Sequence, residues 1–115
     1  MSSPIVFFDI AGHDDQQLRS FYSKIFGWEF DEASQFTVNV VSPLEAAVRK
    51  DPTEKRIYIG VSDITETLNI IKANGGSADT PRFEVPGTVV LGLFKDPAGN
   101  EMGLVEMEGD RPKIP

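Results

Sequence analysis

Residues 94–106 decide the fold of this chain and read Phe94-Lys95-Asp96-Pro97-Ala98-Gly99-Asn100-Glu101-Met102-Gly103-Leu104-Val105-Glu106. Asp96-Pro97 is typical of the start of a tight turn, because the aspartate side chain bonds to nearby backbone N–H groups and proline fixes φ. Gly99 or Asn100 can then adopt a positive φ. Apolar residues precede this turn and resume at Met102, so the stretch predicts a strand, a tight turn and a second strand.

The composition is that of one globular domain with an acidic surface. The chain has 115 residues, of which 40% are hydrophobic and 25% charged, and a chain of this size can bury a real core. Its net charge of −7 argues against nucleic acid and against anionic membrane surfaces as partners. The absence of cysteine excludes disulfides, thiolate metal sites and cysteine nucleophiles.

The sequence carries no sign of membrane insertion or export. No apolar run approaches the roughly 20 residues that a membrane-spanning helix needs. The first residues, Met1-Ser2-Ser3-Pro4, lack the basic group and apolar stretch of a signal peptide. We therefore expect a cytoplasmic protein.

The two halves of the chain carry the same pattern of expected elements. Each half has a strand, an acidic helix cap, an apolar helix face, a glycine at the helix end and then further strands. Positions about 49 residues apart match, a spacing at which internal repeats should be suspected; the pairs are Asp14 and Asp63, Leu18 and Leu68, and Gly27 and Gly76. This pattern suits an α+β fold of two βαβββ modules, about residues 4–50 and 55–106, in a single domain over residues 1–108.

The helix of the first half follows from apolar residues at the spacing i, i+3, i+4, i+7, i+8, which are Leu18, Phe21, Tyr22, Ile25 and Phe26. Asp14 or Asp15 caps this helix, with Asp14 and Gln17 at capping-box spacing, and Gly27 ends the helix. The strands expected in this half cover residues 4–11, 28–30, 36–41 and 46–49.

The second half is expected to contain strands over residues 56–61, 88–94 and 101–105, with a weak edge strand over residues 82–85 between two prolines. Its helix begins at a cap formed by Ser62 or Asp63 and ends at Gly75-Gly76. Residues 109–115 look like a polar, proline-containing tail with little reason to order.

Three stretches, in this order and at this spacing, resemble the vicinal oxygen chelate superfamily, which holds glyoxalases, bleomycin-resistance proteins and extradiol dioxygenases. The first runs from Ile5 to Phe30 and contains Phe26-Gly27-Trp28-Glu29-Phe30. The second runs from Tyr58 to Ile64, and the third is the Asp-Pro-Ala-Gly-Asn turn. The resemblance implies two βαβββ modules whose curled, mixed sheets enclose a concave cavity, and it implies that a single-domain member pairs as a homodimer.

The resemblance also identifies positions where metal-using members bind a divalent cation. Their histidine and carboxylate ligands lie on four strands, and the metal holds vicinal oxygens of the substrate. In this chain the four positions fall on Phe7, near Ala47, near Arg56 and on Gly103. None of these side chains binds a metal, so we expect neither a metal nor another cofactor.

Other polar residues leave alternatives open. The one histidine, His13, stands in the loop expected after the first strand, and it is either a solvated loop residue or a catalytic or metal-binding group. Strand alternation places Asp9 with Phe7 and Glu101 with Gly103. These two carboxylates either have structural roles or bind Mg²⁺ or Mn²⁺ through oxygen.

The expected cavity face is formed by Phe7, Asp9, Arg56, Tyr58, Glu101 and Gly103. Arg56 either anchors a carboxylate or phosphate of a ligand or pairs with Asp9 or Glu101 inside the fold. Tyr58 either donates a hydrogen bond to a ligand or makes a core or dimer contact, and Phe7 either stacks on a ligand or fills the core. The opposite strand faces should pack under the helices through Phe8, Ile10, Ile57, Ile59, Val61, Met102 and Leu104.

A concave face with aromatic walls and few polar anchors is typical of small-molecule sites. We therefore favour binding of a small organic molecule without a metal. One alternative is an enzyme of the same family, which either uses a metal for isomerisation, lyase chemistry or ring cleavage, or uses Asp9 or Glu101 as a base beside Arg56 or Tyr58. Another alternative is an interaction protein without chemistry.

Overall fold

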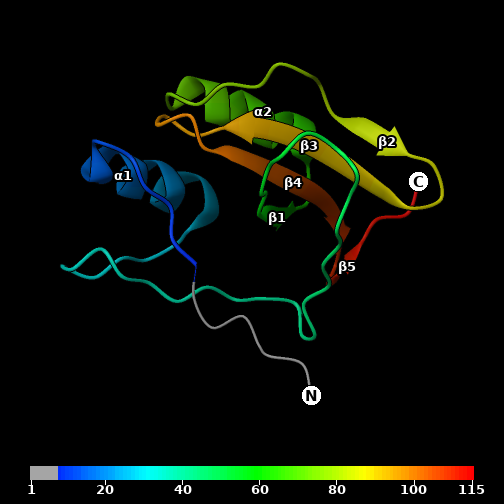
Figure 1. Ribbon diagram of the computed structural model, residues 1–115, viewed down its shortest axis with the longest axis horizontal. Helices are drawn as coiled ribbons and strands as arrows, with labels where there is room; N and C mark the ends of the chain where they lie inside the picture. The colour runs from blue at the N-terminus through cyan, green and yellow to red at the C-terminus, as the bar shows by residue number, and fades with distance from the viewer. Residues whose placement is uncertain (1–7) are drawn as a thin grey trace.

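The computed structural model describes residues 8–115, so Phe7 and the start of the expected first strand lie outside the described residues. The helices lie against the sheet (Figure 1). In chain order the elements are α1 (Asp15–Phe26), β1 (Tyr58–Val61), α2 (Ile64–Ala73), β2 (Phe83–Val85), β3 (Val89–Lys95), β4 (Glu101–Glu108) and β5 (Arg111–Pro112). Neither helix is long and apolar enough to cross a membrane, a finding that applies to the described residues.

The sheet is mixed, with the strand order β1-β4-β3-β2 and with β5 paired to β4. β1 runs parallel to β4, while β3 is antiparallel to both β4 and β2. The elements from β1 to β4 therefore form one complete βαβββ module. The α+β class and the βαβββ pattern are confirmed for the second half, including the edge strand β2.

Both helices begin where the sequence predicts. α1 also ends as expected at Gly27, while α2 ends at Ala73 with Asn74 as its C-cap, just before the expected Gly75-Gly76. The side chain of Asp14 accepts a hydrogen bond from the N–H of Gln17, and that of Asp63 accepts one from the N–H of Glu66, each at 3.0 Å. These bonds satisfy N–H groups that lack a partner within the first helical turn. Gly27 ends α1 in the left-handed conformation with φ 70°, which glycine adopts without steric cost.

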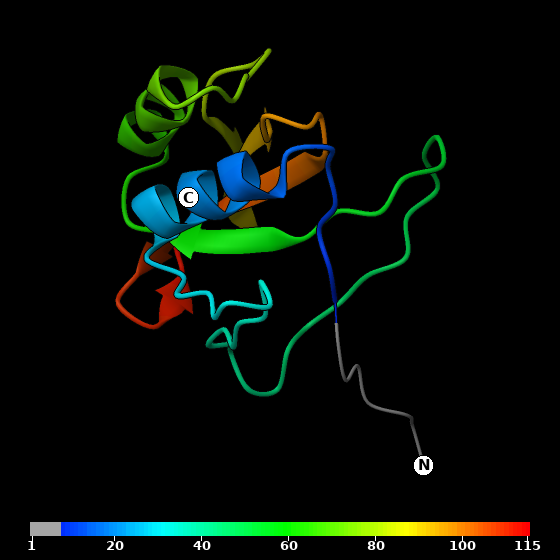
Figure 2. The same cartoon turned by 90° about the vertical axis from the view of Figure 1, so that its left-hand side faces the viewer.

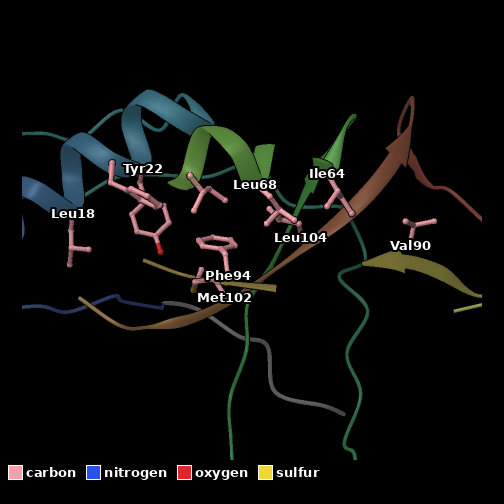
Figure 3. Close-up of a cluster of buried hydrophobic side chains, with 10 residues drawn as sticks. Leu18, Tyr22, Ile64, Leu68, Val90, Phe94, Met102 and Leu104 are labelled. Atoms are coloured by element: carbon pink, nitrogen blue, oxygen red, sulfur yellow. The ribbon is translucent and has the colours of Figure 1, made fainter. Parts of the chain in front are cut away.

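The core lies between the two helices and the face of the sheet that they cover, as Figure 3 shows. Ile64, Val90 and Leu104 are completely buried. Each such side chain contributes roughly 1.5–3 kcal/mol through burial. The other members of this core cluster are Leu18, Phe21, Tyr22, Leu68, Ile71, Phe94 and Met102.

The Asp-Pro-Ala-Gly-Asn turn joins β3 and β4, and the predicted strand, turn and strand are confirmed. Asp96 is 3% exposed, and its Oδ1 accepts hydrogen bonds from the backbone N–H groups of Ala98 and Asn100, each at 2.9 Å. Gly99 adopts the positive φ, at 91°. The motif is therefore a folded turn held by its own aspartate.

The same aspartate connects the turn to the first half of the chain. Its Oδ2 accepts hydrogen bonds from Asn100 Nδ2 at 2.8 Å and from the Tyr22 hydroxyl of α1 at 3.0 Å. Asn100 Nδ2 also donates to the carbonyl of Ala11 at 2.8 Å. Burial, together with the charge of Asp96, raises the pKa of the Tyr22 hydroxyl, so Tyr22 remains a donor in this contact.

The strands expected in the first half are not formed by the described residues. Residues 28–30, 36–41 and 46–49 belong to no strand, nor do residues 8–11. Residues 39–55 are exposed throughout, and Figure 2 shows the segment between α1 and β1 as a long loop that departs from the sheet. The alternating apolar pattern predicts burial of side chains, but a strand also needs a neighbouring backbone for its hydrogen bonds.

Of the expected fold, the α+β class with a mixed βαβββ sheet is confirmed, and the described residues form one such module. The described residues contain one open sheet rather than two sheets curled around a cavity. In place of strands, the first half packs by aromatic contacts: Phe36 lies 5.2 Å from Trp28 and 4.5 Å from Phe30, measured between ring centroids.

The expectation of little order after Glu108 is wrong. β5 pairs with β4, with Met107 opposite Pro112. The N–H of Lys113 donates to the carbonyl of Glu106 at 2.9 Å, and the carbonyl of Pro115 accepts from the N–H of Gly87 at 3.1 Å. Backbone hydrogen bonds, which composition does not reveal, hold these polar residues against the sheet.

Candidate functional site

The sheet has two chemically different faces, and the strand partition expected from the sequence is confirmed for the helix-covered one. Met102 and Leu104 belong to the core, and four of the other residues expected there pack against it, namely Ile10, Ile57, Ile59 and Val61. Phe8 instead contacts the rings of Trp28 and Phe36. Side chains alternate along each strand, so the neighbouring positions point to the other side.

That other side is called here the helix-free face and consists of Tyr58, Leu91, Leu93, Gly103 and Val105. Strand register brings these residues together, because Gly103 lies opposite both Tyr58 and Leu93 while Val105 lies opposite Leu91. Leu91, Leu93 and Val105 are half-buried, and Tyr58 is 43% exposed. The helix-free face is thus an apolar surface with one phenol hydroxyl.

Tyr58 and Gly103 are in close contact on this face. A Cβ atom placed on Gly103 would lie 2.4 Å from Cδ2 and 2.5 Å from Cε2 of the Tyr58 ring. Real Cβ atoms almost never come that close to a neighbour. The space in which a side chain at position 103 would start is therefore filled by Tyr58.

Arg56 is bonded within the fold, at the end of the helix-free face. Its Nη1 donates to the carbonyl of Met102 and its Nη2 to Oε2 of Glu54, each at 3.0 Å. Nη2 also lies 3.7 Å from a carboxylate oxygen of Glu101. The side chain is only 10% exposed, so of the two alternatives for Arg56, the structure contains the intramolecular pairing with Glu101.

Three residues that were not predicted for the site complete this group of charges. Glu54 accepts hydrogen bonds from both Arg49 and Arg56, and Arg49 also bonds to Asp51 at 2.7 Å. The hydrogen bond from Arg49, followed by that from Arg56, lowers the pKa of Glu54. The sequence signal is the run of charged residues where the two expected modules meet, but which of these charges pair depends on the path of the loop.

Of the remaining expected site residues, Glu101 lies beside Arg56. Asp9, His13 and Glu101 are exposed. Ala47 lies within the exposed segment 39–55. Within residues 8–115, no three histidine, cysteine, aspartate or glutamate side chains are grouped closely enough to hold a metal ion.

The positions implied by the resemblance do not fit a metal ion. Gly103 has no side-chain atom that could bind a metal, and Tyr58 covers it. Arg56 is a cation that already bonds to a carboxylate. Cations repel one another, and a guanidinium has no free electron pair to donate. No chemical step through a metal is derived from this arrangement.

The sequence analysis also missed a buried carboxylate on the helix-covered face. Glu106 is 6% exposed and accepts two hydrogen bonds from Arg82, at 2.8 and 3.0 Å, and one from the N–H of Ile64 at 3.1 Å. The bond from Arg82 is the main reason that the pKa of Glu106 is lowered to about 2. Strand alternation could have revealed it, because it places Glu106 on the same apolar face as Met102 and Leu104. A carboxylate buried on such a face needs hydrogen-bond or charged partners.

The fold is that of an α+β protein built on a βαβββ sheet, and comparison with known proteins identifies its family. The model of the Glyoxalase/Bleomycin resistance protein/Dioxygenase superfamily matches residues 5–104. The chain belongs to this superfamily, which is the one that the sequence resembles.

Curated relatives are distant and longer. "Putative glyoxylase CFP32" of Mycobacterium tuberculosis is 23% identical over 111 residues, and the protein of the same name from Mycobacterium bovis matches equally. The alignment covers 84% of this chain and 42% of the relative, so the chain spans less than half the length of these proteins.

Solved structures with the same fold match nearly the whole chain. The hypothetical protein SA1046 from S. aureus has a TM-score of 0.65 at 16% identity, with 93% of this chain and 96% of that chain covered. A glyoxalase-related enzyme from Fulvimarina pelagi has a TM-score of 0.64 at 17% identity, with 92% and 89% covered. At these identities the likeness concerns the fold alone.

Proposed function

We propose that this chain is a small-molecule-binding member of its superfamily that works without a metal ion. The observation that carries the proposal is the contact between Tyr58 and Gly103, because the ring fills the space where metal-using members place a carboxylate. A chain with glycine at this position and a tyrosine ring above it offers an apolar surface instead of a ligand for a cation.

The helix-free face is the proposed binding surface. Its half-buried leucines and valine supply apolar contact area, and the partly exposed Tyr58 supplies a hydroxyl that can donate a hydrogen bond. Such a combination of apolar walls with a few polar groups is typical of small-molecule sites. We propose that Phe7 and Asp9 also belong to this binding surface and that Glu101 lies at its edge.

The proposal includes the two-module architecture and a homodimer. Apolar side chains of the segment between α1 and β1 are exposed, among them Val40 at 60%, Leu44 at 59% and Val48 at 103%. An exposed apolar segment of this kind favours a partner surface. A second copy of the chain would cover it and help to enclose the helix-free face.

Two measurements test the metal-free part and the binding part separately. Plasma mass spectrometry of protein purified without chelator should find divalent metal far below one ion per chain. Equilibrium dialysis against pooled aromatic and carboxylated metabolites should retain at least one compound, and Tyr58→Ala should weaken its retention. A full complement of bound metal would contradict the first part, and a broad library without any binder would favour the interaction protein instead.

A further inference from the structure

A hollow that shares no residue with the helix-free face lies between α1 and the segment that follows it. It has a volume of about 270 Å³ and is lined by residues that include Arg19, Tyr22, Trp28, Phe30 and Phe36. Figure 2 shows this segment running back alongside α1. The volume lies just below the range of drug-sized pockets, so the hollow suits a compound of one or two rings.

The walls of the hollow are stacked aromatic rings. Trp28 stacks on Tyr22 with 5.1 Å between centroids and 8° between planes. It also stacks on Phe36 at 5.2 Å and 22°. Aromatic side chains present flat apolar area that loses little conformational freedom when a ligand binds. These walls favour a planar aromatic ligand.

Arg19 lines the hollow, and one nitrogen of its guanidinium lacks a hydrogen-bond partner among the described residues. This nitrogen, Nε, is buried. A buried donor without an acceptor is unfavourable, and the aromatic side chains that line the hollow offer no strong acceptor. A carboxylate satisfies a guanidinium better than a neutral group does, because the hydrogen bond is then charge-assisted.

Asp15 also borders the hollow, one helical turn before Arg19. Its carboxylate opposes an incoming anion, but the side chain is exposed, so solvent and salt screen its charge. Arg19 is the stronger influence on what binds, because it is partly buried whereas Asp15 is exposed.

We infer that this hollow is a binding site for a small aromatic carboxylate, whose ring packs among Trp28, Phe30 and Phe36 while its carboxylate accepts from Arg19. The inference does not depend on the helix-free face, because no residue is shared between the two surfaces.

The test uses the one tryptophan of the chain, because Trp28 gives a single indole N–H signal in ¹H–¹⁵N correlation spectra. Benzoate, titrated into the full-length protein, should shift this signal with a saturable dependence. Benzamide has the same shape without the charge and should bind roughly tenfold more weakly. Asp15→Asn should tighten benzoate binding.

Arg19→Gln should weaken benzoate binding roughly tenfold or more while the weaker binding of benzamide changes little. Lys24→Gln is the matched control, since it removes one positive charge from an exposed position of the same helix and should leave both affinities within about twofold. Equal affinities of the unmodified protein for benzoate and benzamide would overturn the inference without any variant. Retention of full benzoate affinity by a folded Arg19→Gln protein would overturn it as well.

Discussion

The ring of Tyr58 on β1 lies directly over the α-carbon of Gly103 on the parallel strand β4, so that a Cβ at position 103 would come within 2.4 Å of the ring. This contact has a structural and a functional consequence. It fixes the side of the ring that faces the sheet, and it removes the space for any side chain at position 103. A chelating residue could return to this strand only if Tyr58 moved.

Gly103→Ala should therefore destabilise the protein by about 1 kcal/mol, toward the lower end of the costs of overpacking, because the 43% exposed Tyr58 can swing partly outward. In a Tyr58→Ala background the same substitution should cost markedly less. Urea denaturation of the four proteins gives the coupling between the two positions. Equal costs of Gly103→Ala in both backgrounds would show that the ring does not restrict position 103.

Local patterns in the sequence predicted the second half of the chain well. Asp63 caps α2, the Asp-Pro turn joins β3 and β4, and Met102 and Leu104 face the core. Each of these features depends on residues close in sequence, and turn chemistry and side-chain periodicity are local properties. They could be predicted because no distant partner is needed to define them.

Pairings between distant residues could not be predicted in the same way. The bond between Tyr22 and Asp96 joins residues 74 positions apart, and nothing in the local pattern around Tyr22 distinguishes it from an ordinary core aromatic. The strands expected over residues 28–49 failed for a related reason, because alternation does not specify which backbone lies alongside. Pairing of Arg56 with Glu101 was one of two alternatives open from the sequence, while its bonds to Glu54 and to the carbonyl of Met102 required the structure.

Tyr22→Phe should lower the free energy of unfolding by about 1–3 kcal/mol, since it leaves the buried Asp96 without one of its donors. The substitution removes only a hydroxyl, and the 3.0 Å bond to Oδ2 of Asp96 is the interaction lost. Urea denaturation measures the change. Tyr58→Phe is the matched control, because Tyr58 is 43% exposed, and it should change stability by a few tenths of a kcal/mol at most. Similar losses in both variants would argue against a special role for the Tyr22 hydroxyl.

The ordered C-terminal residues should contribute to stability. Deletion of residues 111–115 removes β5, the bond from Lys113 to the carbonyl of Glu106, and the bond from Gly87 to Pro115. We expect a fall of several degrees in the melting temperature, as for the loss of roughly 1 kcal/mol in a domain of this size. Calorimetry measures this fall. An unchanged melting temperature would mean that these residues only rest against the sheet.

The carboxylate of Glu106 should make stability depend on pH in the acid range. Its pKa is lowered from 4.5 to about 2, mainly by the hydrogen bond from Arg82. A group whose pKa is lower in the folded state stabilises the fold above its unfolded pKa, and this contribution is lost as the pH falls through the folded value. The free energy of unfolding should therefore decrease between about pH 4.5 and pH 2, by at most about 3 kcal/mol for this group.

Glu106→Gln keeps the size of the side chain but removes the charge that binds Arg82 and Lys113. The variant should be less stable than the unmodified protein at pH 7, and the difference between them should shrink as the pH falls through about 2, because Glu106 of the unmodified protein then becomes neutral as well. Glu108→Gln, at the exposed end of the same strand, is the control and should preserve the full acid dependence. A constant difference between Glu106→Gln and the unmodified protein across this pH range would mean that packing, rather than the ionised carboxylate, holds β4 to α2.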